Sequence, residues 1–127
     1  MIQFIEALRG YLIDLGHGPF VVDNLKDEPR DLICIYDTGG LPSIINEQVA
    51  GAPESIEIQF RARNASQEDA RAALLAIQSD LHRLTGENIG EYSIFLAVAI
   101  ERPAVLTRDA KHNWHLVSTY QITARAN

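Results

Sequence analysis

The stretch IYDTGGLPS, from Ile35 to Ser43, holds the residues whose types and spacing could most readily do chemistry. A short apolar run leads directly into Asp37-Thr38-Gly39-Gly40. Aspartic proteases use two carboxylates that share one proton, and each carboxylate lies in an Asp-Thr-Gly turn that follows an apolar strand. Asp37 therefore has two interpretations: half of a dimeric protease site, or the turn at the end of a strand.

The protease interpretation lacks its partner groups. No second apolar strand is followed by a glycine-rich aspartate motif, and Tyr36 stands where the motif prefers an aliphatic residue. Aspartic proteases are almost wholly β, whereas about a third of this chain shows helical spacing of apolar residues. The turn interpretation needs no partner groups, because Asp and Thr side chains hydrogen-bond to nearby backbone and glycine permits positive φ. We therefore predict a turn at Asp37 rather than a catalytic carboxylate.

The other reactive side chains form no recognisable catalytic or metal site. His112 and His115 are three residues apart, so in a strand or hairpin they face opposite sides, and no cysteine or carboxylate cluster completes a ligand set. We predict that both are solvated turn residues. The sequence contains neither Gly-x-Ser-x-Gly nor a phosphate-binding loop. These patterns predict no enzyme, no metal and no cofactor.

Two hypotheses from different classes remain. In the first, the chain is a binding or assembly protein, which is the default when no catalytic set is found. In the second, it is a small enzyme or ligand-binding domain that uses Asp37 with Arg61 and Arg63, since two arginines on one strand face could hold an anion. The same arginines could instead pair with Glu57 or with a neighbouring subunit.

The length, charge and cysteine content of the chain limit which classes of protein it can belong to. The 127 residues suit one domain, 1–127, and the only cysteine, Cys34, allows no internal disulfide. The net charge of -6 argues against a protein that grips nucleic acid. The first sixty residues carry most of the acidic surplus. No signal peptide and no membrane-spanning stretch is predicted, so we expect synthesis in the cytoplasm and no membrane partner.

Apolar spacing and breakers predict the elements that must position these groups. The expected elements are a helix at 2–15, a strand or anchor at 20–22, a strand at 32–36, a long loop at 37–54, a strand at 55–63, a helix at 66–84, a central strand at 92–100, a polar turn at 109–113 and a final strand at 114–125. The fold class is α+β, with a mostly antiparallel sheet of about four to five strands and two helices packed on one face.

The strand at 55–63 has the clearest pattern. Its two faces are Ile56, Ile58, Phe60 and Ala62 on one side, and Glu57, Gln59, Arg61 and Arg63 on the other. We expect the apolar face to pack under the helix that Ser66 caps, and the polar face to meet water or a partner.

Four segments together resemble a known family. They are IQFIEALRGYL, ICIYDTGGLP, PESIEIQFRARNASQEDARAALLAIQSDLHRL and RPAVLTRDAKHNWHLVSTYQITAR, which span most of the chain. Their order and local patterns are similar to those of the tail-terminator or minor capsid proteins found in the neck of long-tailed phages.

The resemblance implies a structural role in the virion. Such proteins form a homo-oligomeric ring, usually of six subunits, that caps the tail tube and stops its polymerisation. The ring also presents a surface to the head-side connector or stopper, and DNA passes through its bore without specific binding. Other neck components, namely stoppers, adaptors and tail-completion proteins, are an alternative.

The resemblance also suggests which residues meet a neighbour. The loop that begins at Asp37 is expected to reach a neighbouring subunit or the bore, and the polar strand face and the Leu-x-Arg-Asp turn are further candidates. The expected interface residues are Asp37, Gly39, Gly40, Ile44, Ile45, Arg61, Arg63, Arg108 and Asp109.

Overall fold

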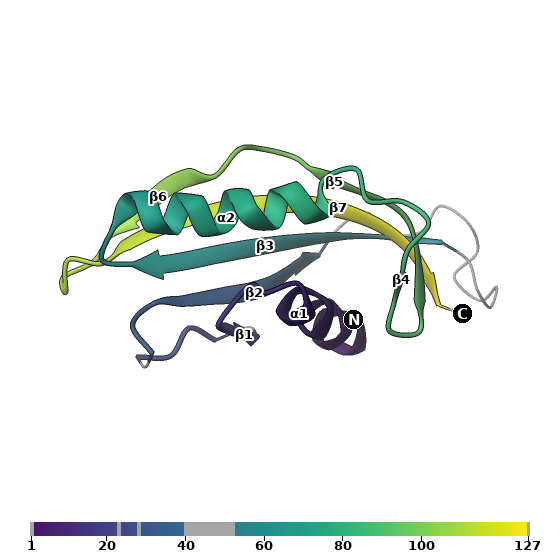
Figure 1. Ribbon diagram of the computed structural model, residues 1–127, viewed down its shortest axis with the longest axis horizontal. Coiled ribbons are helices and arrows are strands. Elements are labelled where there is room, and N and C mark those ends of the chain that lie inside the picture. Colours follow the sequence, from purple (N-terminus) through teal and green to yellow (C-terminus); the bar gives the residue numbers. More distant parts are fainter. Residues whose placement is uncertain (1, 23, 28, 40–52, 127) are drawn as a thin grey trace.

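The computed structural model describes residues 2–22, 24–27, 29–39 and 53–126 (Figure 1). Its elements, in chain order, are α1 (Ile2–Asp14), β1 (Phe20–Val22), β2 (Leu32–Gly39), β3 (Glu54–Asn64), α2 (Gln67–Leu81), β4 (Asn88–Ile89), β5 (Tyr92–Ala99), β6 (Ala104–Arg108) and β7 (Trp114–Ala126). Most of the predicted 37–54 loop, including Gly40, Ile44 and Ile45, lies outside the described residues.

The strands form one seven-stranded sheet, so the expected number of four to five is wrong. The order is β1-β2-β3-β7-β5-β4, and β6 pairs with β7 beyond the end of β5. Every pairing is antiparallel except that of β1 with β2. The two strands that were not predicted from the sequence are short. Strand β4 has two residues and β6 has five, which is too few for a clear alternation of apolar and polar positions.

The apolar face of β3 is buried, as its alternation predicted. Ile56, Ile58, Phe60 and Ala62 belong to the same hydrophobic cluster as the buried side chains of α2. The 11 residues of β3 pair with β7 along their whole length and with β2 over most of it. This strand therefore fixes the register of the sheet's centre.

Both helices contribute to that one cluster. The buried side chains of α1 are Phe4, Ile5, Leu8 and Leu12, and those of α2 are Ala70, Leu74, Ile77 and Leu81. The helices contact different strands: α1 meets β1, β2 and β4, while α2 lies along β3 and β7 and also meets β5 (Figure 1). Together they line the core over most of the sheet.

The second helix is shorter than its sequence pattern suggested. It ends at Leu81 rather than at residue 84, because His82 already has an extended backbone. Leu84 then forms an isolated β-bridge with Ala97. Pairing with β5 therefore removes the last residues of the apolar stripe from the helix, a tertiary effect that helical spacing does not show.

The start of α2 gives a first stability prediction. The Asp69 backbone N–H donates to the Ser66 hydroxyl at 3.2 Å, as expected for an N-cap. Ser66→Ala should lower the free energy of unfolding by about 1 kcal/mol, measured by urea denaturation. Ser79→Ala is the matched control, because Ser79 is exposed in the same helix. Equal losses in both variants would show that the cap does not stabilise the fold.

The strand β5 differs from the prediction of a central strand buried on both faces. Ile94 and Ala97 are buried, but Phe95 and Leu96 are more than two-fifths exposed. A register shift between Ile94 and Leu96 interrupts the alternation. Phe95 and Leu96 therefore leave this apolar strand partly exposed to solvent.

Candidate functional site

The residues predicted to form an interface fall at different places on the sheet. Asp37 pairs with Ile58, whereas Arg63 pairs with Leu32 at the other end of β2. Ile58 and Arg63 are five positions apart in β3, which is roughly 17 Å along the strand. The structure therefore does not bring Asp37 together with the two arginines, as the ligand-binding hypothesis required.

The Asp-Thr-Gly segment is not a turn at the end of a strand. The strand β2 continues through Gly39, with a register shift between Asp37 and Gly39. Thr38 lies at this bulge and donates its hydroxyl to the carbonyl oxygen of Glu57 at 3.1 Å and to the Glu57 carboxylate at 3.0 Å. The long neighbour β3 keeps pairing past Tyr36, which overrides the local turn preference of Asp and Gly.

Arg63 is not on an exposed strand face. Its side chain is only 8% exposed, and its guanidinium donates to the backbone carbonyls of Lys26, Asp27, Pro29 and Arg30. Three of these contacts measure 3.2, 2.8 and 2.9 Å, to Asp27, Pro29 and Arg30 respectively. Arg63 therefore fastens the segment before β2 to the sheet within one subunit.

Arg61 belongs to a chain of polar side chains on the same face. Its Nε donates to Nδ1 of His115 at 3.1 Å, and Nε2 of His115 lies 2.8 Å from the Asp109 carboxylate. With Nδ1 facing the Arg61 donor, Nε2 is the ring nitrogen that donates to Asp109. His115 is buried, and the prediction that it is a solvated turn residue is wrong.

Asp109 organises the turn between β6 and β7. One carboxylate oxygen accepts the backbone N–H groups of Lys111 at 2.9 Å and Asn113 at 3.0 Å. The hydrogen bond from His115, followed by that from Asn113, lowers the pKa of Asp109 well below its ordinary 3.8. Arg30 completes the cluster by donating to the Asn113 side chain at 2.6 Å.

The depressed pKa of Asp109 predicts a dependence of stability on pH. Because the folded pKa is the lower one, the ionised carboxylate stabilises the fold fully above about pH 3.8, and this contribution is lost as pH falls through the folded pKa. Asp109→Asn should be less stable at neutral pH, since an amide N–H would oppose the His115 donor. Urea denaturation from about pH 7 to about pH 3 should show the difference narrowing below about pH 4. A difference that stays constant over that range would contradict the assignment.

Arg108 is not a member of this hydrogen-bonded group of side chains. It pairs with Trp114 across the strands, and its guanidinium carbon is 5.1 Å from the centre of the Trp114 ring. Such a cation–π contact holds the arginine against the sheet while leaving it exposed. Arg108 and Asp109 are therefore adjacent in the sequence but contact different residues.

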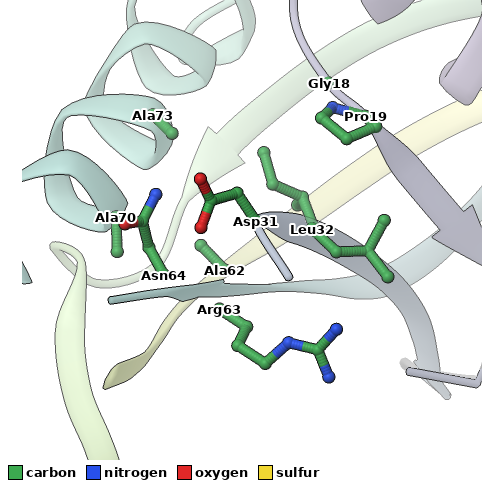
Figure 2. Close-up of a pocket in the computed structure, with 10 residues that line it drawn as sticks. Gly18, Pro19, Asp31, Leu32, Ala62, Arg63, Asn64, Ala70 and Ala73 are labelled. Carbon is green, nitrogen blue, oxygen red and sulfur yellow. The ribbon is translucent and has the colours of Figure 1, made fainter. Parts of the chain in front are cut away.

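The cavities near these groups do not resemble a catalytic cleft. Two polar hollows of about 230 and 290 Å³ adjoin the 109–113 turn, and their lining includes both Asp27 and Lys111. A third, of about 60 Å³, lies between α2 and the sheet; Figure 2 shows that Arg63 points away from its Ala70 and Ala73 wall. It is much smaller than an ordinary ligand pocket.

The described residues contain no group of three or more His, Cys, Asp or Glu side chains placed to hold a metal ion. Among the helices within the described ranges, none has the length and apolar character needed to cross a membrane.

Sequence reasoning missed His115, Asn113 and Arg30 as members of the polar cluster. The spacing of Asp109, Asn113 and His115 around one turn was a usable signal, because Asp commonly accepts backbone N–H groups a few residues ahead. Arg30 gave no such signal, since its partner lies 83 residues away.

The sequence model of a family described as bacteriophage tail terminator protein matches residues 11–125, from within α1 to the last residue but one of β7. No individually curated protein matches the chain significantly.

Proposed function

The chain belongs to the bacteriophage tail terminator family, and on that premise we propose that it forms a ring that caps the tail tube. The protein is a structural component associated with the phage tail. In the proposal, about six copies close into the ring, which stops further addition of tube subunits and joins the tube to the head-side connector or stopper.

The observation that carries this proposal is the extent of the family match. It covers the chain from residue 11 to residue 125 and includes the whole of β1 to β6 and of α2, together with β7 up to its last residue but one. A match confined to one hairpin would support only a shared local motif. Here the sheet and the helix that covers its centre are matched together.

The state of the polar groups agrees with a structural role. Arg63, His115 and Asp109 bond to groups of their own subunit, and their contacts organise backbone segments. A catalytic set needs a group left available to a substrate near a concave site. The hydrogen bonds of Arg63, His115 and Asp109 instead stabilise the turn at 109–113, which precedes β7, and the segment at 26–30, which precedes β2.

The charge of the chain suits passage of DNA through a ring. A net charge of -6 provides no general attraction for phosphates, so DNA in the bore would not be gripped. A lumen lined by clustered Lys and Arg would slow DNA by releasing bound counterions. We therefore propose that DNA is a transient occupant rather than a specific ligand.

The proposed ring is tested by mass. Sedimentation velocity and native mass spectrometry over a range of concentrations should find a closed species of about 85 kDa, six times the 14.1 kDa of one chain. The measurement should be repeated with tail tubes present, where the ring has its binding surface. A chain that stays monomeric in both experiments would contradict the ring.

A further inference from the structure

One margin of the sheet, the strand β6, is open and apolar. It pairs with β7 on one side, and no described residue pairs with it on the other (Figure 1). Natural sheets protect such edges with charged residues or proline, but β6 begins Ala-Val-Leu and has its only charge at its last residue, Arg108. Val105 and Leu106 are 43% and 51% exposed. An open strand edge with exposed apolar side chains is a surface that another molecule can cover.

Positive charges surround this strand. The exposed or partly exposed cations around it are Arg71, Arg102, Arg108 and Lys111, and β6 together with them is called the basic margin. Arg71 reaches it from α2, where its guanidinium donates to the Pro103 carbonyl at 3.2 Å. The acids of the same stretch bond within the subunit: Glu101 accepts from the Thr119 hydroxyl at 3.3 Å, and Asp109 holds the turn. The margin therefore offers its free charges mainly as cations.

Exposed carboxylates gather around one flank of α1. Burial raises the pKa of Tyr11, and the negative charge of Glu87 raises it further, so Glu87 lies near this flank. Asp14 shares the flank, because it is three residues beyond Tyr11 on the helix. The β4–β5 hairpin, whose turn carries Glu91, packs on the same helix. Asp14, Glu87 and Glu91, with the 46% exposed Leu15, are called the acidic end.

The basic margin and the acidic end lie at opposite ends of β7. Arg108 of β6 pairs with Trp114, whereas Tyr92, which follows Glu91, pairs with Ala126. Trp114 and Ala126 are twelve positions apart in β7, which is roughly 40 Å along the strand. Figure 1 likewise shows β6 and β4 toward opposite ends of the long axis. One subunit therefore does not join its own two surfaces, whereas a second copy can.

We propose that the basic margin of one copy docks on the acidic end of the next copy, and that this contact builds the ring. The inference rests on the ring proposed above and names the surfaces that form it. Unlike surfaces give head-to-tail contacts, which close into a ring when the rotation allows. Arginines that face carboxylates determine which surfaces meet, while Val105, Leu106 and Leu15 become covered. Two basic margins brought together would place cations near cations, so charge disfavours a two-fold dimer.

Charge reversal at each surface tests the contact. One variant carries Arg102→Glu with Arg108→Glu, and the other carries Glu87→Lys with Glu91→Lys. All four side chains are exposed, so both variants should fold, which circular dichroism checks. Sedimentation velocity should show the ring lost or at least tenfold weaker for each variant alone. The first variant is more acidic than the wild type and the second is less acidic, so net charge does not explain both losses.

Recovery of the ring identifies the two surfaces as partners. A chain with all four reversals should assemble again, because its two surfaces once more carry opposite charges. An equimolar mixture of the two variants should form rings in which they alternate, which native mass spectrometry resolves. Loss in only one variant, or loss in both without recovery, would overturn the pairing. Normal rings from both variants would overturn it and leave the ring intact; if those rings no longer bound tail tubes, the surfaces would belong to the tube contact instead.

Hydrogen exchange on the wild-type chain gives a second measurement that needs no substitution. In the ring, backbone N–H groups of both 104–108 and 87–91 should exchange more slowly than in the dissociated subunit. A ring that forms with neither segment protected overturns the proposed contact alone. A dimer with only 104–108 protected would show that like margins pair, which also overturns it. A wild-type chain that never assembles overturns both this contact and the proposed function.

Discussion

Phe60→Ala should cost roughly 3–5 kcal/mol of the free energy of unfolding, the range expected for truncation of a fully buried aromatic side chain. Phe60 is fully buried at the centre of β3. Its ring meets Tyr120 edge-on at 5.5 Å between centroids and Phe20 at 6.5 Å. Truncation would leave a cavity below α2 and remove both ring contacts. Urea or guanidinium denaturation measures the loss directly.

Phe95→Ala is the matched control for this prediction. Phe95 is 41% exposed on β5, and the centre of its ring lies 5.6 Å from the guanidinium carbon of Arg125. Its truncation should cost no more than about 1 kcal/mol. If the two variants lost similar amounts, Phe60 would not be the centre of the core, and the packing of β3 beneath α2 would need revision.

Arg63→Met should cost about 2–4 kcal/mol, because it removes the donors of four backbone carbonyls while keeping most of the side-chain volume. The carbonyls belong to the segment before β2, where Lys26, Asp27, Pro29 and Arg30 are exposed. Unfolding should be measured together with limited trypsin digestion. Cleavage after Lys26 and Arg30 should become faster, since that segment would open locally.

Arg61→Met provides the comparison on the same strand face. Arg61 is half-buried and donates through Nε to Nδ1 of His115. We expect a loss near 1 kcal/mol and little change in cleavage after Lys26. Should Arg61→Met prove as damaging as Arg63→Met, or should Arg63→Met leave digestion unchanged, the anchoring role of Arg63 would be wrong.

The parts of the fold that could be predicted from sequence are those with strong local periodicity. Alternation in β3 identified both its strand and its buried face, and Ser66 identified the start of α2. Each of these depends on residues close together in the chain. The family resemblance, confirmed by the match over residues 11–125, likewise rested on long segments in a fixed order.

The parts that could not be predicted depend on distant partners. Arg63 has the position of an exposed strand residue, and only the return of the chain at 26–30 buries it. His115 is buried because Arg61 and Asp109 both reach it. The short strand β6 forms because β7, which follows it, supplies the hydrogen-bonding edge. In each case, contacts between residues far apart in the chain determine a burial or a strand that the local sequence pattern does not specify.

The central claim, that this protein terminates the tail tube, is tested most directly on growing tubes. Purified tail tube protein should be polymerised with and without this chain, and the tubes measured and imaged by electron microscopy. Tubes formed with the protein should stop growing and carry one ring at one end. Tubes that keep growing without any end-bound ring, or that bind the chain along their walls, would contradict the account.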